Sequence, residues 1–263
     1  MIGYVCKYTP IAIIESFGEK TCRLEPTTSN FDQAHTYTHP NICSYAKAVL
    51  EQCLNENFNQ LILTTCCDSI KRIADLLAAQ NNLKFLYLLD LPRKRNAAGE
   101  QKFTQELIKL IQAYEKFTQT KFSPANMLKI LTTKENKPIS TAGDKLKIGV
   151  TGARCPQSII ELIEEFDGKI IHNLTCTGEL NLPNLNPKAE KNLISWYARS
   201  LLNTYPCMRM EDIDDRYQTI VESSKQLDGI IHHSVKFCDF YSFDYAYLKQ
   251  KLDIPLLKIE TDY

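Results

Sequence analysis

No stretch of this chain is apolar for long enough to cross a membrane, and neither sign of charge is in excess. A transmembrane helix needs roughly 20 apolar residues in a row, and no run in the sequence approaches that length. The 31 lysines and arginines balance the 31 aspartates and glutamates, so the charge indicates no nucleic-acid or anionic-membrane partner. Residues 1–6 also lack the basic start and long apolar region of a signal peptide. We therefore expect a cytoplasmic protein.

Two common cofactor-binding patterns are missing as well. The sequence has no Cys-x-x-Cys pair, which is the spacing on which tetrathiolate zinc sites are usually built, and no Gly-rich phosphate loop stands out. Ten cysteines are nevertheless present in the 263 residues. A chain of this size in a reducing compartment has little need of a disulfide framework. Metal binding or catalysis is therefore the usual role of those cysteines that are not simply packed in the core.

Short apolar segments typical of strands alternate with longer segments of helical periodicity. The expected strands cover residues 1–6, 59–65, 83–89, 146–151, 169–174, 228–234 and 254–259. The expected helices cover residues 11–17, 41–53, 68–79, 99–119, 124–132, 155–166, 188–202, 211–226 and 242–252. Helices placed regularly between strands indicate parallel βαβ units. We expect an α/β protein of two Rossmann-like, doubly wound domains.

The polar, turn-rich residues 133–145 are the best linker candidate in the chain. They suggest an N-terminal domain over 1–140 and a C-terminal domain over 145–263. Residues 19–40 are also polar and are expected to form a loop. The sequence ends just after the last expected strand, where such a domain usually closes with a helix, so we expect a thinly covered sheet face or a longer natural chain.

Six cysteines follow an expected strand or begin an expected helix. They are Cys43, Cys66, Cys67, Cys176, Cys207 and Cys238. Backbone N–H groups at a helix start favour the negative charge of a thiolate, and ligands bind at the carboxyl edge of open parallel sheets. Burial explains any one of these thiols better than ligation does. Six in this setting predict a cluster of ligands in the cleft between the two domains.

Scattered thiols suit a buried iron–sulfur cluster better than a zinc site, although a zinc or metal-free protein stays an alternative. Cys53 lies inside a helix and is expected in the core, whereas Cys6 at the end of the first strand fits either role. The pair His232 and His233 is expected either to donate protons or hydrogen bonds at the site or to face solvent.

Nine segments, in this order along the chain, resemble one known family. They are Tyr8–Pro10, His39–Tyr45, Cys67–Arg72, Leu89–Arg93, Cys176–Gly178, Pro206–Met210, Asp228–Ile231, Lys236–Asp239 and Ile259–Tyr263. The family is that of the 2-hydroxyacyl-CoA dehydratases, and the chain looks like its D-component. Benzoyl-CoA reductase subunits and the double-cubane cluster proteins belong to the same family.

The resemblance implies two Rossmann-like domains around an oxygen-sensitive cluster. In the dehydratases three cysteines hold a [4Fe-4S] cluster, and the corresponding positions look like Cys43, Cys66 or Cys67, and Cys238. In the double-cubane proteins six cysteines hold an [8Fe-9S] cluster, and this chain has six candidates when Cys176 and Cys207 are added. Spacing alone does not choose between the two.

The resemblance also implies an anaerobic enzyme, activated by an ATP-dependent iron–sulfur partner, that performs low-potential electron transfer. The expected reaction is reductive dehydration (a lyase) or reduction (an oxidoreductase) of a CoA thioester or small molecule. The alternatives are a double-cubane reductase of small molecules and a non-catalytic electron carrier or scaffold. We expect a homodimer or heterodimer, and no catalytic residue is assigned from the sequence.

Overall fold

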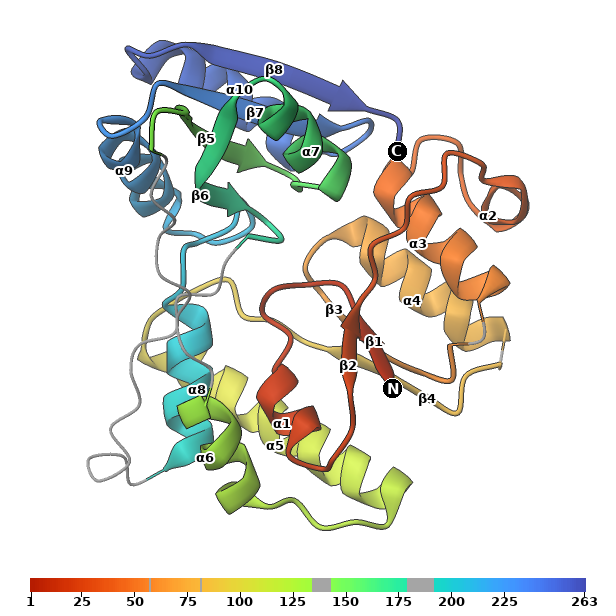
Figure 1. Cartoon of the computed structure of the whole chain (residues 1–263). Helices are drawn as coiled ribbons and strands as arrows, with labels where there is room; N and C mark the ends of the chain where they lie inside the picture. Colours follow the sequence, from red (N-terminus) through yellow and green to blue (C-terminus); the bar gives the residue numbers. More distant parts are fainter. Residues whose placement is uncertain (57, 81, 134–142, 179–191) are drawn as a thin grey trace. The chain divides into compact units, whose positions relative to one another are not determined.

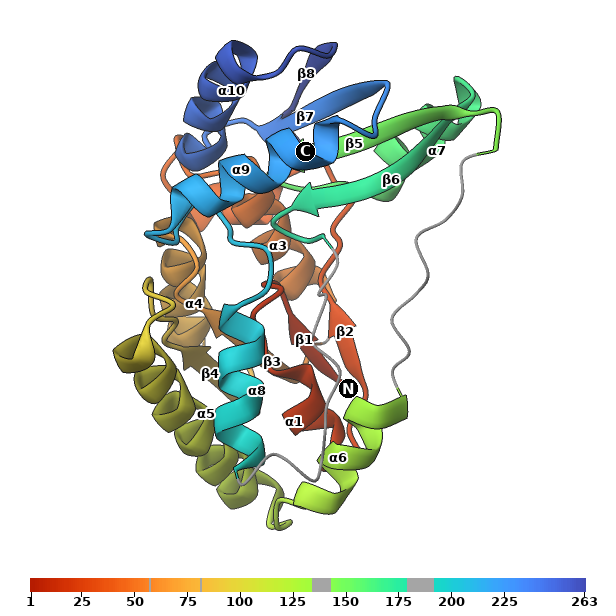
Figure 2. The same cartoon turned by 90° about the vertical axis from the view of Figure 1, so that its left-hand side faces the viewer.

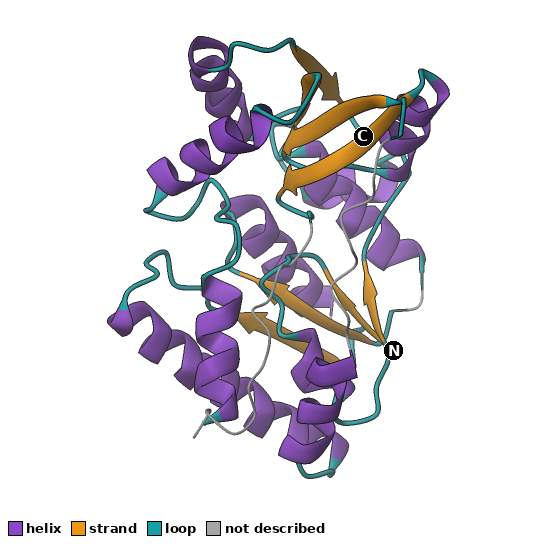
Figure 3. Cartoon of the chain, turned by 60° about the vertical axis from the view of Figure 1, so that its left-hand side comes forward, coloured by secondary structure: helices purple, strands orange, loops and turns teal. Residues whose placement is uncertain are grey.

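The computed structural model describes residues 1–56, 58–80, 82–133, 143–178 and 192–263. Within these residues eight strands and ten helices form two separate parallel sheets with their helices (Figures 1 and 3). Contacts divide the chain into two compact units. Unit 1 comprises 1–24, 49–136 and 181–204, and unit 2 comprises 25–48, 137–180 and 205–263. The predicted domain spans 1–140 and 145–263 stay a prediction, because contacts alone do not show which segments fold independently.

The sheet of unit 1 has four parallel strands in the order β2-β1-β3-β4. The strands are β1 (Ile2–Tyr4), β2 (Thr21–Arg23), β3 (Gln60–Thr64) and β4 (Phe85–Leu89). The apolar run Leu61–Leu63 is completely buried, as is typical of a strand covered on both faces. The strand order reverses direction between β1 and β3, and the carboxyl end of such a switch point is where open α/β sheets bind ligands.

The helices of unit 1 present one apolar face each to this core. They are α1 (Ile11–Glu15), α4 (Asp68–Gln80), α5 (Ala97–Thr118), α6 (Pro124–Thr133) and α8 (Leu193–Leu202). Asn96 caps the start of α5, because its side chain accepts a hydrogen bond from the Gly99 backbone N–H at 3.0 Å. It buries Phe103, Leu107 and Leu110 at helical spacing and packs against α8 (Figure 2). Helix α3 (Ser44–Asn55) crosses the division between the two units.

The sheet of unit 2 repeats the same strand order, as β6-β5-β7-β8, again with all strands parallel. Its strands are β5 (Leu146–Gly152), β6 (Gly168–Thr175), β7 (Gly229–Val235) and β8 (Leu256–Thr261). Its helices are α2 (Asp32–Tyr37), α7 (Gln157–Glu165), α9 (Ile213–Ser224) and α10 (Asp239–Lys251).

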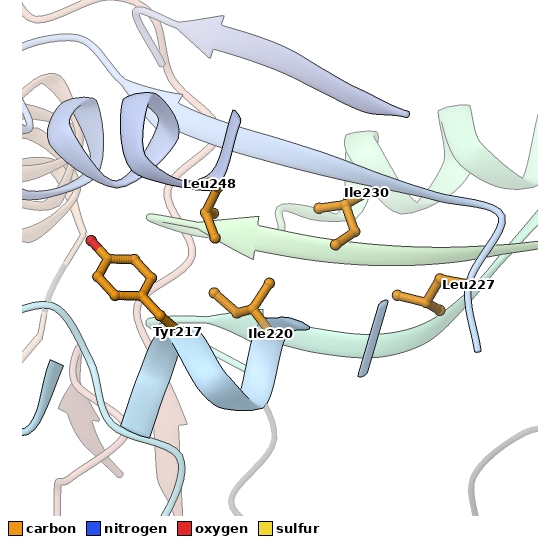
Figure 4. Packing of buried hydrophobic residues seen from close by; sticks show 5 residues of the cluster. All are labelled: Tyr217, Ile220, Leu227, Ile230 and Leu248. Atoms are coloured by element: carbon orange, nitrogen blue, oxygen red, sulfur yellow. The ribbon is translucent and has the colours of Figure 1, made fainter. Parts of the chain in front are cut away.

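Two neighbouring residues of β7 show that helices cover both faces of this sheet. Ile230 packs with Tyr217 and Ile220 of α9 and with Leu248 of α10 (Figure 4). Ile231 packs instead with the cluster that contains the buried α7 residues. Because successive side chains of a strand point to opposite faces, α9 and α10 lie on one face and α7 on the other. The predicted doubly wound α/β architecture with parallel sheets is therefore confirmed.

The structure also differs from the prediction in places. The expected loop over 19–40 is wrong, since it contains the edge strand β2 and the short helix α2. Strand β2 is only three residues long and only partly buried, so it lacks the alternating apolar pattern that identifies a strand. Residues 134–142 of the expected linker and 188–191 of the expected helix lie outside the described residues. None of the described helices combines the length and hydrophobicity that a membrane span requires.

Candidate metal centre

The ten cysteines are divided between the two units, and all of them are free thiols. Of the six that the sequence singles out, unit 2 holds four, namely Cys43, Cys176, Cys207 and Cys238. Unit 1 holds Cys66 and Cys67. Each group is described within its own unit.

Cys43 and Cys238 come together in unit 2, each at the start of a helix. Cys43 directly precedes α3, and Cys238 is the residue that caps the start of α10. The two side chains share a thiol–thiol hydrogen bond. Ser44 fixes the first segment, because its backbone N–H donates to the Lys236 carbonyl at 3.2 Å and its hydroxyl donates to Asp262 at 2.5 Å.

This pair contains one acidic thiol and one that resists ionisation. The hydrogen bond from Cys238, helped by backbone N–H groups at the start of α3 and by the charge of Arg154, lowers the pKa of Cys43 to about 7 although burial opposes it. The pKa of Cys238 is raised, first because its thiol donates to Cys43 and then because it is buried. Since the thiolate is the form that binds metal, Cys43 is prepared for ligation near neutral pH.

Cys176 is a third thiol in the electrostatic surroundings of this pair. It follows β6, its backbone N–H donates to the Gly152 carbonyl at 3.2 Å, and its thiol donates to the carbonyl of Ala153. A Cβ at Gly178 would lie 2.2 Å from the Asn173 carbonyl oxygen, so the turn that positions Cys176 requires glycine there. The negative charge of a Cys176 thiolate contributes to the raised pKa of Cys238.

Cys207 is buried in the same unit. Its carbonyl accepts the backbone N–H of Met210 at 3.0 Å in the turn before α9. Its charge affects the pKa of Tyr241 in α10 and of Tyr205. Cys207 is thus within electrostatic range of the helix that Cys238 caps.

Arg154 belongs to this site although no sequence motif singles it out. It follows β5 at the switch point between β5 and β7, and its side chain is only 1% exposed. Its guanidinium stacks on the ring of Tyr45 at 3.9 Å and pairs with the carboxylate of Glu25. The signal that could have found it is its place two residues beyond the last residue of a central strand.

His232 and His233 are fully buried, so the alternative that they face solvent is wrong. His232 Nε2 donates to the Tyr241 carbonyl and Nδ1 accepts from the Thr151 hydroxyl, both at 3.0 Å. His233 Nδ1 donates to the Arg154 carbonyl and Nε2 accepts from Thr261, both at 2.9 Å. Burial lowers the pKa of both imidazoles. All four ring nitrogens thus form hydrogen bonds with protein groups. Two of these bonds fix the backbone carbonyls of Arg154 and of Tyr241 at the start of α10.

Unit 1 has its own group of thiols at the switch point of its sheet. Strands β1 and β3 are parallel neighbours with Tyr4 opposite Ile62, so Cys6 and Cys66 both follow the carboxyl ends of adjacent strands. The Cys6 and Cys66 thiols share a hydrogen bond, and the Cys66 thiol is also hydrogen-bonded to the Cys67 thiol. The pKa of Cys6 is raised well above its usual range, first by the bond to Cys66 and then by burial. Cys6, which the sequence leaves undecided, is therefore part of this group.

Cys53, by contrast, stands apart from these groups. It is buried in α3, and burial raises its pKa to about 12. Both observations agree with the prediction that it is a core residue.

The donor set fits a cluster held by thiolates. In unit 2 the thiols of Cys43 and Cys176 are within electrostatic range of the buried Arg154 guanidinium, and Cys43 is hydrogen-bonded to Cys238. A nearby cation stabilises negative sulfur. Among the described residues no three His, Cys, Asp or Glu side chains are close enough to hold one metal ion.

Comparison with known proteins agrees with the resemblance seen in the sequence. The family model described as 2-hydroxyglutaryl-CoA dehydratase, D-component, matches residues 6–137 and 128–263. The (R)-phenyllactyl-CoA dehydratase beta subunit of Clostridium sporogenes is 23% identical over 324 aligned positions, which cover 99% of this chain and 86% of that subunit. The predicted family is confirmed: the chain belongs to the 2-hydroxyglutaryl-CoA dehydratase D-component family.

Proposed function

We propose that this chain is the iron–sulfur subunit of a dehydratase that acts on a 2-hydroxyacyl-CoA thioester. The observation that carries the proposal is the pair of hydrogen-bonded thiols, Cys43 and Cys238, at two helix starts in a chain of the D-component family. A family-level role as a dehydratase-like enzyme follows from the comparisons. The cluster and its ligands are the part that we propose.

We assign a [4Fe-4S] cluster to Cys43, Cys238 and one of Cys66 and Cys67, following the family pattern. When bound, such a cluster supplies a single electron at low potential. The chain itself provides a thiol of lowered pKa at Cys43. A turn holds the Cys176 thiol against the Ala153 carbonyl. His232 is neutral and hydrogen-bonded through both ring nitrogens, one of them to the Tyr241 carbonyl in the first turn of α10. The buried rings of Tyr45 and Tyr241 keep water from the helix starts that carry the two thiols.

Partners and location follow from the same proposal. The relative is named as a beta subunit, so we expect this chain to work with a second subunit, as a heterodimer or homodimer. We also expect an ATP-dependent iron–sulfur activator and activity in the anaerobic cytoplasm. A non-catalytic electron carrier or scaffold is the outcome if the activator reduces the cluster but no thioester turns over.

A specific observation favours a second candidate, an [8Fe-9S] double cubane. Cys176 lies within electrostatic range of Cys238, and Cys207 influences Tyr241 in the helix that Cys238 caps. Together with Cys43, Cys66, Cys67 and Cys238 these make six thiols. The double-cubane candidate predicts a reductase of small molecules.

The first experiment is an iron count on protein purified without oxygen. Cys238→Ala is expected to lose most of its iron, because it removes a thiol of the central pair. Cys53→Ala is the control, since it removes a thiol that is buried outside the site. Circular dichroism verifies that both variants are folded. Equal iron content in the two variants contradicts the assignment.

A further inference from the structure

We propose that Arg154 is the counter-cation of the thiolate site in unit 2 and that its charge raises the midpoint potential of the bound cluster. This inference rests on the proposed function. It concerns a residue that lies outside the cysteine set, and its test measures a potential rather than turnover.

The structure places Arg154 between the two segments that carry Cys43 and Cys176. On one side its guanidinium stacks on Tyr45, two residues after Cys43. On the other side its neighbour Ala153 accepts the hydrogen bond of the Cys176 thiol. The Arg154 carbonyl is fixed by His233 at 2.9 Å. The position of the cation is therefore set by the same contacts that set the thiols.

Two donors of this guanidinium make no hydrogen bond of normal geometry. Nη2 pairs with Glu25 and the group also interacts with the side chain of Tyr263, but Nε and Nη1 are buried and make no such bond among the described residues. A buried charged donor without an acceptor costs free energy. The thiolates and sulfides of a cluster are acceptors and negative charges, so a cluster at this site explains why the donors are left free.

Arginine suits this role better than lysine. It stays protonated even when buried, so its effect on the potential does not depend on pH. Its planar group also stacks on an aromatic face, as it does on Tyr45. A positive charge near a cluster stabilises the reduced state, which carries one more negative charge, and so raises the midpoint potential.

Removing the Glu25 carboxylate is expected to shift the midpoint potential in the opposite direction from removing the Arg154 guanidinium. Its carboxylate is about half exposed, at 48%, and neutralises part of the Arg154 charge. Removing this carboxylate strengthens the effective cation, whereas removing the guanidinium abolishes it. A purely structural role of Arg154 predicts no such reversal.

The experiment is a redox titration, followed by electron paramagnetic resonance, of the cluster in the full chain. Arg154→Gln is expected to shift the reduction equilibrium about tenfold towards the oxidised state, which is about 59 mV for one electron. Arg154→Lys keeps the positive charge, so its midpoint potential is expected to stay close to that of the unmodified chain. Glu25→Gln shifts the midpoint upward. Lys225→Gln is the control, because it removes an exposed cation of the same unit and is expected to leave the midpoint unchanged.

The outcomes separate this inference from the proposed function. If the unmodified chain binds no iron, both fail. If it binds iron and the midpoint is the same in Arg154→Gln, Glu25→Gln and the unmodified chain, the counter-cation is refuted while the cluster assignment stands. If Arg154→Gln does not fold, an unchanged midpoint in Glu25→Gln still overturns the inference.

Discussion

Buried charges in unit 2 are neutralised by one another, and the pair Arg216 and Asp244 shows how. Arg216 Nη2 donates to Asp244 Oδ2 at 2.6 Å, and both side chains are completely buried. Removing one partner of such a pair typically costs about 3–5 kcal/mol, because the other charge is left buried alone. His232 lies 3.9 Å from the same carboxylate. Because Arg216 already balances Asp244, the imidazole gains little by charging and remains neutral.

The neutral histidines predict how the stability of the metal-free chain depends on pH. Burial lowers the pKa of His232 and His233 in the folded chain below the usual value of 6.5. Below pH 6.5 the unfolded chain therefore binds protons that the folded chain does not bind. Stability is therefore expected to fall as pH decreases below about 6.5, by at most about 1.4 kcal/mol per pH unit for each histidine. The groups that face His232 are Asp244, Arg216 and Lys258, and Arg154 faces His233.

Urea unfolding at several pH values measures this slope. His233→Gln is expected to reduce the slope, because one buried imidazole is gone, although it also lowers stability at neutral pH by loss of its hydrogen bonds. His35→Gln changes an exposed histidine of α2 and serves as the control. A slope that is the same in His233→Gln and in the unmodified chain contradicts the neutral assignment.

At the scale of elements, the end of β5 determines where the site lies. Gly152 has φ +102°, and a Cβ there would lie 2.0 Å from the His233 carbonyl oxygen. This close approach lets Ala153 N–H donate to His233 at 2.8 Å and turns the chain toward Cys176. One glycine thus controls the positions of both Arg154 and a candidate ligand.

Gly152→Ala is therefore expected to destabilise the chain by about 3 kcal/mol or more, since a non-glycine residue in this conformation costs about 1–3 kcal/mol and the backbone clash adds to it. Gly18→Ala is the matched control, because Gly18 also has positive φ, +87°, but no atom lies within 4 Å of its added Cβ. Urea midpoints measure both. A similar loss in the two variants means that the close contact with His233 does not matter.

Sequence patterns predicted those elements whose burial is local and regular. The run Leu61–Leu63 and the amphipathic face of α5 are examples, because solvent exclusion imposes a period on them. Strand β2 was missed because its pairing with β1 uses backbone groups that leave no side-chain pattern. The contact between Cys6 and Cys66 was missed because it depends on which strand lies next to β1. The unpaired donors of Arg154 are likewise a property of the folded chain, so no spacing in the sequence reveals them.

At the scale of the whole molecule, each of the two units is built from three separate segments of the chain. Residues 25–48 belong to unit 2 although residues on either side belong to unit 1. Cys43 lies in this segment, and Cys238 lies in the C-terminal part of the chain. The contacts place both in unit 2, where their thiols meet. The two sheets nevertheless share one strand order, so each presents cysteines at an equivalent carboxyl edge.

A set of cysteine variants tests which thiols of the whole chain hold the cluster. The dehydratase-type site requires about four irons, and the double cubane requires about eight. The proposed four-iron site uses one of Cys66 and Cys67, which are hydrogen-bonded to each other in unit 1. One of Cys66→Ser and Cys67→Ser is therefore expected to lose most of its iron, whereas the other keeps it.

Cys176→Ser distinguishes the two clusters in the same assay. A four-iron site keeps its iron without Cys176, because its three thiolates lie elsewhere, whereas a double cubane loses at least one of its two four-iron units. Cys53→Ala, outside both sets, shows how much iron is lost through destabilisation alone. If Cys66→Ser and Cys67→Ser both retain all of their iron, this pair supplies no ligand, and the four candidate cysteines of unit 2 must account for the cluster by themselves.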